Sequence, residues 1–338
     1  MKLVLALRTR DQAELVDALI SFHLNAGVDF VIVTDHRSED GTLEILEAYE
    51  REGCLRLIRE TGEQVRGSEW RTRMAHLAAL EHGADWVLHA DGDEFWWPRG
   101  SSLKEVLEPV PERHGVVRGL LRLFPPRPGV DQFFAERMVV RIHSDAAIND
   151  PASPFRPHAK VAHRGHANVV VDRGAHSLLD GGLSPLHGWC PIEIFHFPVR
   201  SLEQLERKNS VWWDQMKRLG RPGNVQARRF QQAGRLDEFY ASSMVGDEQL
   251  DRGLADGSLV VDTRLRDALR SLRCEQASGP RRFALPRERP EGLDLPLPTA
   301  AEKAAYAVDV DTLEEADTVR LQVRLDVLER RGLPRLRG

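Results

Sequence analysis

Residues 3–90 alternate between short apolar segments and segments with helical spacing, and this alternation constrains the fold more than any other feature. The candidate strands are Leu3–Leu7, Asp29–Thr34, Leu55–Arg59 and Asp85–Ala90. The candidate helices, each followed by a glycine that ends it, are Asp11–Ala26, Thr42–Glu52 and Glu69–His82. Strands joined through helices by short connections pair in parallel, with helices on both faces. The pattern predicts an α/β fold with a Rossmann-like, mostly parallel sheet.

Four residues, Asp91-Gly92-Asp93-Glu94, directly follow the last of these candidate strands. In α/β proteins the carboxyl edge of the sheet is where binding sites form. Gly92 allows a sharp turn, and carboxylates two residues apart can share a hard cation through oxygen ligands. The segment alone is equally compatible with a solvated acidic turn or a structural calcium loop.

The charge balance and the cysteines exclude several classes of protein. The 338 residues carry a formal net charge of −5 and contain no basic block, so we do not expect a nucleic acid partner. Cys54, Cys190 and Cys274 have no metal-binding or redox spacing, which indicates a reducing compartment. The apolar run Met1–Leu7 is too short for a signal sequence or a transmembrane segment. We therefore expect a cytoplasmic protein.

The loops after the first two candidate strands narrow the ligand class. The first loop, Arg8-Thr9-Arg10-Asp11, has no Gly-x-Gly-x-x-Gly, so nicotinamide and flavin dinucleotides are not expected. In the second loop, Asp40 or Thr42 could cap the following helix. Capping leaves Asp35 unexplained. This acid stands at the carboxyl end of a strand, where it could accept a hydrogen bond from a nucleotide base.

Together these segments resemble the GT-A-fold glycosyltransferases of family 2. The shared order is Arg-x-Arg-Asp, then Thr-Asp-x-x-Ser-x-Asp-Gly-Thr, then Asp-x-Asp-Glu-Phe. A bacterial branch of that family also resembles this chain in Arg-Gly-Ala-His at 173–176, His-Phe-Pro-x-Arg-Ser at 196–201 and Asp-Thr-Arg-Leu at 262–265. The resemblance extends to about residue 270. It departs where family members usually have Arg-Asn-Glu after the first strand and Asn at the position of His36, and both departures concern the nucleotide pocket.

The resemblance implies transfer of a sugar from a nucleoside-diphosphate donor, most often a UDP-sugar, to a glycan or small-molecule acceptor, with inversion and with Mn²⁺ or Mg²⁺. The nucleotide-binding residues it implies are Arg8, Thr9, Asp35, Arg73, Asp91, Gly92 and Asp93. Arg71 is the alternative to Arg73 as the arginine that faces the nucleotide. An arginine on this helix could equally be an exposed charge without a role in binding. A divalent ion suits the chemistry, because negative charge develops on the departing diphosphate and oxygen ligands bind such ions well.

The metal ligands that the resemblance implies are Asp93, Asp91 and a downstream histidine. Six of the thirteen histidines fall between residues 158 and 196: His158, His163, His166, His176, His187 and His196. We expect His196 to complete the metal shell, with His176 as the second choice. The same density admits a competing function, a zinc-dependent hydrolase, although the spacing matches no helical zinc motif.

An inverting transfer also needs a base that takes the proton of the acceptor hydroxyl. The candidates are Asp172, Asp180 and Glu193. In a regular strand Glu193 would face away from His196, because side chains alternate, and this favours Asp180.

Four further residues are candidates for substrate contacts. Trp189 could stack on a sugar, although burial is the commoner role of a tryptophan. Lys160 and Arg200 could meet phosphates, as could Lys208, or could simply be exposed charges.

We expect a GT-A-like domain over residues 1–220, with a nucleotide-binding half (1–97) and an acceptor half (98–220). A helical extension (221–275), a Pro-rich linker (276–300) and a C-terminal helix (301–338) would follow. The apolar stripe of that last helix could dock on its own domain or form a homodimer. A third functional hypothesis, a catalytically degenerate module that binds nucleotide or glycan, is motivated by the altered Arg8–Asp11 loop.

Overall fold

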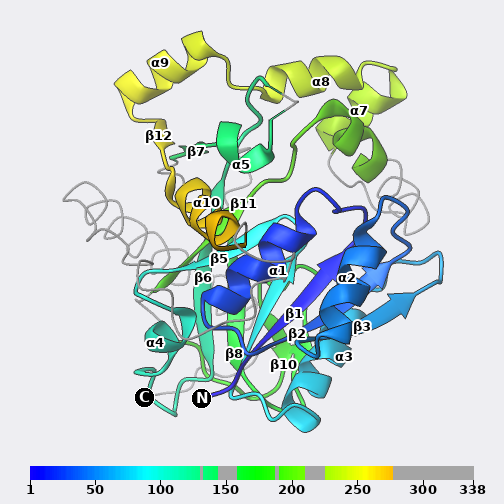
Figure 1. Ribbon diagram of the computed structural model, residues 1–338, viewed down its shortest axis with the longest axis vertical. Coiled ribbons are helices and arrows are strands. Elements are labelled where there is room, and N and C mark those ends of the chain that lie inside the picture. Colours follow the sequence, from blue (N-terminus) through cyan, green and yellow to red (C-terminus); the bar gives the residue numbers. More distant parts are fainter. Residues whose placement is uncertain (130–131, 144–157, 187–189, 210–224, 277–338) are drawn as a thin grey trace, which may run out of the picture.

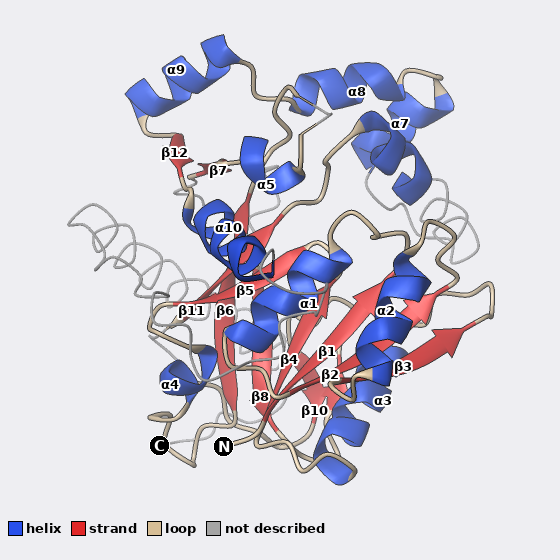
Figure 2. Ribbon diagram, in the orientation of Figure 1, coloured by secondary structure: helices blue, strands red, loops and turns tan. Residues whose placement is uncertain are grey.

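A computed structural model of the chain describes residues 1–129, 132–143, 158–186, 190–209 and 225–276. Among these residues, an eight-stranded sheet in the order β3-β2-β1-β4-β8-β6-β11-β5 forms the centre of the molecule (Figure 1). Helices cover both of its faces, as Figure 2 shows for the face turned to the viewer. Three features expected from the sequence lie outside the described residues. They are the sugar contact of Trp189, the Pro-rich linker and the C-terminal helix.

The first half of the sheet is the predicted parallel unit. Its strands are β1 (Leu3–Thr9), β2 (Phe30–His36), β3 (Leu55–Glu60) and β4 (Trp86–Asp91). The helices between them are α1 (Val16–Asn25), α2 (Thr42–Arg51) and α3 (Gly67–Leu80). All neighbouring pairs in the order β3-β2-β1-β4 are parallel. The strands run further than expected, so Arg8, Thr9 and Asp35 belong to strands instead of loops.

The second half of the sheet is mixed. It consists of β5 (Glu94–Pro98), β6 (Val116–Leu123), β8 (Ala159–Arg164) and β11 (Ile192–His196). Strand β8 is antiparallel to both β4 and β6, whereas β11 is parallel to β6 and antiparallel to β5. The acidic motif is therefore a tight connection between two strands, since β5 begins at Glu94. The fold class predicted from the sequence is confirmed.

Shorter elements surround this sheet. They are α4 (Leu103–Leu107), α5 (Phe134–Arg137), β7 (Val140–Ile142), β9 (Val170–Val171), β10 (Leu178–Asp180), α7 (Val225–Gln232), α8 (Leu236–Ser243), α9 (Asp247–Asp256), β12 (Leu259–Val261) and α10 (Arg264–Gln276). Residues 202–209 are also helical, and the Ser201 hydroxyl accepts from the Gln204 amide at their start (3.1 Å). Strand β7 begins only at Val140, because the preceding residues Phe134–Arg137 are helical.

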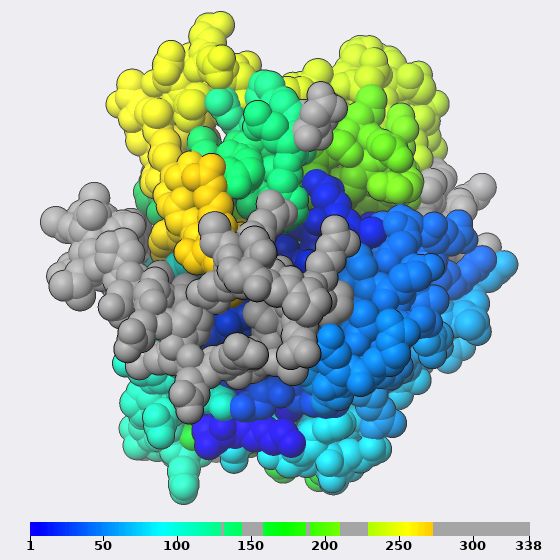
Figure 3. Space-filling view, in the orientation of Figure 1, coloured from blue at the N-terminus to red at the C-terminus, as the bar shows by residue number. Residues whose placement is uncertain are grey.

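Alternate residues of the central strands pack on opposite faces of the sheet. On β1, Leu5 joins a core with α1, α2 and α10, while Ala6 joins a smaller core with Met74 and Ala78 of α3. Both sets are apolar because both faces are covered, as expected for parallel strands. In the space-filling view (Figure 3), the yellow and orange residues of α9 and α10 lie beside green residues that precede them in the chain. No helix in the described part of the chain is both long and apolar enough to cross a bilayer.

The register of the parallel strands brings the site residues to one edge. Arg8 pairs with Asp91, and Thr9 pairs with Asp35, so the ends of β1, β2 and β4 meet. On the other side, His196 at the end of β11 pairs with Glu94 at the start of β5. The two halves of the sheet thus converge on the Asp91–Glu94 segment.

Candidate active site

A cavity of about 410 Å³ opens at this edge of the sheet. Most of the residues that line it are charged or polar, and they come from both halves of the sheet and from the 202–209 segment. They are Arg8, Thr9, Arg10, Asp11, Gln12, His36, Val65, Trp70, Asp91, Gly92, Asp93, Glu94, Leu121, His158, Lys160, Gly174, His176, His196, Gln204, Arg207 and Lys208.

Asp91 is held by three cations. Its Oδ1 accepts from Arg8 Nε (3.0 Å) and from an Arg71 guanidinium nitrogen (2.6 Å), and its Oδ2 accepts from Lys160 Nζ (2.7 Å). Burial would raise the pKa of this carboxyl, but Arg71, Arg8 and Lys160 outweigh burial and hold the pKa well below its ordinary value. Asp91 is therefore ionised, and its oxygens already have partners.

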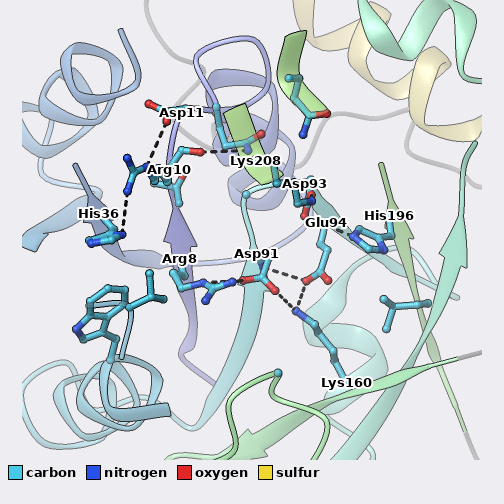
Figure 4. A pocket seen from close by; sticks show the side chains of 18 of the residues that line it. Arg8, Arg10, Asp11, His36, Asp91, Asp93, Glu94, Lys160, His196 and Lys208 are labelled. Carbon is cyan, nitrogen blue, oxygen red and sulfur yellow. Dashed lines mark hydrogen bonds and ion pairs between the residues drawn. The ribbon is translucent and has the colours of Figure 1, made fainter. Parts of the chain in front are cut away.

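Lys160 joins Asp91 to the third acid of the motif. Its ammonium lies 2.5 Å from Glu94 Oε2, and both side chains are 2% exposed. The same Glu94 oxygen accepts from the Asp91 backbone N–H at 2.9 Å, which closes the tight connection between β4 and β5. Figure 4 shows Arg8, Asp91, Glu94 and Lys160 as one network, with Asp93 and His196 beside it.

Asp93 has a separate set of partners. Its Oδ2 accepts from Lys208 Nζ at 2.7 Å, and its Oδ1 lies 3.6 Å from His196 Nε2. Burial would raise the pKa of Asp93, but Lys208 and His196 outweigh it, so the pKa lies below its ordinary value. Asp93, Glu94 and His196 each offer a ligand atom, and these atoms lie within 4.8 Å of one another. Two carboxylates and one imidazole suit Mn²⁺ or Mg²⁺.

Gly92 lies against β1. A Cβ at this position would come within 2.8 Å of Gln12 Cγ and 3.0 Å of Thr9 Oγ1. Position 92 therefore requires glycine because the backbone passes too close to the end of β1 for a side chain. The Thr9 hydroxyl at this contact is buried without a hydrogen-bond partner.

Asp35 is buried but is not among the residues that line the cavity. Its carboxylate accepts from the Ser38 hydroxyl (2.5 Å) and the Ser38 backbone N–H (3.2 Å). Burial raises the pKa of Asp35. The next residue, His36, does line the cavity, with its Nε2 2.8 Å from the Gly62 carbonyl oxygen and its ring 5.0 Å from that of Trp70.

Of the two helical arginines, Arg71 reaches the acidic motif. It is 1% exposed, and besides Asp91 it contacts the Arg173 carbonyl oxygen. Arg73 instead forms an ion pair with Glu60 at the surface, and its side chain is 44% exposed. The structure thus places Arg73 outside the cavity, and the alternative position, Arg71, is the one that contacts Asp91.

None of the three acids considered as a base, Asp172, Asp180 and Glu193, lines the cavity. Glu193 is buried on the other face of β11, where it binds Arg122 (2.7 Å), Arg264 (2.7 Å) and Arg99 (3.3 Å). Asp180 is exposed at the end of β10 and does not line the cavity. Glu193 lies on the opposite face of the strand from His196 because side chains alternate along a strand and the two residues are three positions apart.

The remaining candidates divide between the cavity and the protein interior. His176 lines the cavity, and its Nδ1 lies 2.8 Å from the Ala159 carbonyl oxygen. Lys160 also lines it, as described above. Arg200 does not, because its guanidinium is buried against Glu14 (3.1 Å), the Phe197 carbonyl (3.0 Å) and Gln12 (2.8 Å).

The expectations did not include several residues that line the cavity, among them Arg10, Trp70, Glu94, Gln204 and Arg207. Glu94 could have been found from the sequence, because it completes the acidic motif. Gln204 and Arg207 belong to the helix that Ser201 begins, and nothing in a single sequence indicates that this helix faces the acidic motif.

One family model and several solved structures are similar to this chain. The model of Glycosyltransferase family 92 matches residues 8–114, less than half of the chain. No curated protein matches this chain. Among solved structures, Staphylococcus aureus TarS 1-349 in complex with UDP has a TM-score of 0.35 and 16% identity, covering 95% of this chain and 92% of that one.

Two further structural matches are shorter. For another structure of TarS 1-349 the TM-score is 0.33 at 16% identity, covering 62% of this chain and 64% of the TarS fragment. For glucosyl-3-phosphoglycerate synthase from Mycobacterium tuberculosis, in complex with Mn²⁺, UDP and phosphoglyceric acid, the TM-score is 0.25 at 20% identity, covering 38% and 44%. The segment that matches the glycosyltransferase family, residues 8–114, includes Asp91, Asp93 and Glu94.

Proposed function

We propose that the chain is a metal-dependent, inverting glycosyltransferase of GT-A fold, similar to family 2, which uses a nucleoside-diphosphate sugar. A UDP-sugar is the favoured donor, the acceptor is a glycan or small molecule, and the reaction takes place in the cytoplasm. One observation carries the proposal. The Asp91–Glu94 motif lies in a cavity of about 410 Å³ at the carboxyl edge of the parallel half of the sheet, within the segment that matches a glycosyltransferase family. UDP in the TarS and synthase structures supports the choice of UDP.

The charges of the cavity suit a diphosphate. Five cationic side chains line it: Arg8, Arg10, Lys160, Arg207 and Lys208. Guanidinium and ammonium groups bind phosphate oxygens through charge-assisted hydrogen bonds. Because Arg8 and Lys160 are fixed by Asp91, they are oriented before a donor arrives, and preorganised charges stabilise a leaving group most effectively.

Asp93, Glu94 and His196 would hold the divalent ion, since their ligand atoms lie close together and their donor types fit Mn²⁺ or Mg²⁺. Such an ion, when bound, stabilises the negative charge of the departing nucleoside diphosphate. Asp91 would orient Arg8, Arg71 and Lys160 in this proposal, because both of its oxygens are already engaged by these cations. Mn²⁺ together with UDP in the synthase structure supports a metal here.

His176 is the residue we propose as the proton acceptor. Its Nδ1 donates to the Ala159 carbonyl oxygen at 2.8 Å, which leaves the lone pair on Nε2. As the acceptor oxygen bonds to the anomeric carbon and the bond to the diphosphate breaks, the hydroxyl proton would pass to Nε2. The acids at the motif are less suitable, because Asp91, Asp93 and Glu94 each bind a cation.

Thermal unfolding with UDP, GDP, dTDP, CDP and ADP, each with and without Mn²⁺, tests the proposal. A ligand that binds only the native state raises stability by about 2.7 kcal/mol at a hundredfold excess over its dissociation constant. We expect UDP to shift the melt, and the shift to require Mn²⁺. A shift with Zn²⁺ and with no nucleotide would favour the hydrolase, and nucleotide binding without any release of UDP from UDP-sugars would favour the degenerate binding module.

A further inference from the structure

Each carboxylate of the Asp91–Glu94 motif already has a cationic partner from the chain itself. Asp91 and Glu94 share Lys160, and Asp93 binds Lys208. A divalent ion that binds here therefore arrives at carboxylates which are already neutralised. It must either share them with the side-chain cations or displace one of them, and the structure distinguishes the cations by how firmly each is held.

Lys160 is held too firmly to be displaced. It is 2% exposed, it contacts two carboxylates at 2.7 and 2.5 Å, and its strand, β8, lies between β4 and β6 in the sheet. If it moved away, its charge would be left inside the protein without a counter-ion, which is strongly unfavourable. Arg71 is equally enclosed, at 1% exposed.

Lys208 is held much more loosely. Its side chain is 42% exposed, and its ammonium contacts one carboxylate, Asp93 (2.7 Å), and the Pro198 carbonyl oxygen (3.2 Å). An ion pair with this much solvent access changes an equilibrium by no more than about fivefold, and the released ammonium regains its hydration. Asp93, by contrast, is 7% exposed and stays in place as a ligand.

We propose that Lys208 is an internal counter-ion of Asp93, which competes with the divalent metal and binds the donor diphosphate once it is displaced. The inference rests on the proposed function. Without nucleotide, a divalent ion at Asp93 and the ammonium repel each other, so the ion binds weakly. A diphosphate placed between them binds both, because its oxygens can contact the ion and Lys208 together. Metal and nucleotide therefore assist each other's binding.

The test measures Mn²⁺ and UDP separately on the full chain with Lys208→Met. Mn²⁺ binding without nucleotide is followed by the loss of the electron paramagnetic resonance signal of the free ion. UDP binding at saturating Mn²⁺ is followed by calorimetry. We expect Mn²⁺ to bind about two- to fivefold more tightly than to the wild type. We expect UDP to bind about tenfold more weakly, because one charge-assisted contact to phosphate is lost.

Arg207→Met is the matched control for removal of one positive charge. Arg207 is the preceding residue, lines the same cavity and is 46% exposed, but its ion pair is with Glu203 (3.7 Å). Only the Lys208 variant should bind free Mn²⁺ more tightly. The melting temperature of each variant without ligand checks that both are folded.

The two opposite changes separate this proposal from a structural role of Lys208. A structural lysine would weaken both ligands or neither, and either result overturns the proposal. It is equally overturned if Arg207→Met tightens Mn²⁺ as much, or if neither the wild type nor Lys208→Met binds Mn²⁺. If Lys208→Met binds Mn²⁺ more tightly but no protein binds UDP, the competition at Asp93 stands, whereas the diphosphate role and the proposed function fail.

Discussion

The part of the chain that the structure describes contains two groups of enclosed carboxylates bound by cations, and the two groups differ in what they face. Asp91, Asp93 and Glu94 line the cavity at the sheet edge. Glu193 precedes the cavity residue His196 by three positions in the chain. Its carboxylate nevertheless lies on the opposite face of β11, where it binds Arg122, Arg264 and Arg99. Asp262 completes this second group through Arg264 (2.6 Å) and Arg141 (3.2 Å).

The comparison shows that an altered pKa does not by itself locate a site. Burial would raise the pKa of Glu193, but Arg122, Arg264 and Arg99 outweigh it and hold the pKa well below the ordinary value, as happens at Asp91. The two groups differ in position. The Asp91–Glu94 group lies where parallel strands end beside a cavity. The Glu193 and Asp262 group lies in the packed interior, away from the cavity. We therefore expect substitutions in the first group to affect turnover and those in the second to affect stability.

Asp93→Asn should give the largest effect. Loss of a metal-binding carboxylate should reduce the release of UDP from a UDP-sugar in Mn²⁺ by about a thousandfold, equivalent to about 4 kcal/mol in activation free energy. Glu193→Gln, measured per folded molecule in the same assay, should keep the turnover of the wild type. Equal losses in the two variants would remove the distinction between the groups.

Glu193→Gln should give the reverse result in stability. Removal of a 4% exposed carboxylate leaves the arginines around it without their shared counter-ion, so the free energy of unfolding should fall by about 3 kcal/mol. Urea denaturation measures this change. Asp93→Asn should cost less, because its partner Lys208 is 42% exposed and can return to water. A larger loss for Asp93→Asn would contradict the comparison.

The pH dependence of this stability difference sharpens the assignment. The pKa of Glu193 is lower in the folded chain than its usual value of 4.5. Its contribution to stability is therefore complete above pH 4.5 and is lost as the pH falls toward the folded-state pKa. The gap in unfolding free energy between wild type and Glu193→Gln should stay constant from pH 7 to about 5 and shrink below that. A gap that widens with acid would show the opposite sign of the pKa shift.

Arg73→Met should give the smallest effect. Its ion pair with Glu60 is exposed, so the free energy of unfolding should change by less than about 1 kcal/mol, and the affinity for UDP with Mn²⁺ should not change. Arg71→Met is the matched variant on the same helix. It should weaken UDP binding, because Arg71 holds Asp91 in place. If Arg73→Met weakened UDP binding more than Arg71→Met, the placement of these arginines would be wrong.

The parallel half of the fold could be predicted from the sequence because each strand there is apolar and each helix has a glycine after it. The choice between Arg71 and Arg73 is also open to sequence reasoning. Arg71 shares a helical face with Ala75 and Ala78, which are buried, and Arg73 does not. The alternation of side chains along a strand likewise predicts that Glu193 points away from His196.

Strand β8 could not be predicted with the same arguments. Lys160 and His163 are polar, but they are 2% and 0% exposed, because each has a partner far away in the chain: Lys160 binds Asp91 and Glu94, and His163 contacts His89 at 2.9 Å. An apolar pattern cannot reveal a strand whose buried residues are satisfied by such distant contacts. The position of the 202–209 helix likewise depends on a distant contact, that of Lys208 with Asp93, which an apolar pattern does not reveal.

The insertion of β8 beside β4 has a consequence for the order of folding during synthesis. Lys160 is 69 residues from Asp91 in the chain, so β4 leaves the ribosome long before its neighbour exists. At about 5–20 residues per second, the edge of the nascent sheet waits roughly 3 to 14 seconds for that strand. During this time an unpaired edge can recruit other chains. The cell therefore makes the acidic motif well before the lysine that neutralises it, and the site forms only with the second half of the sheet.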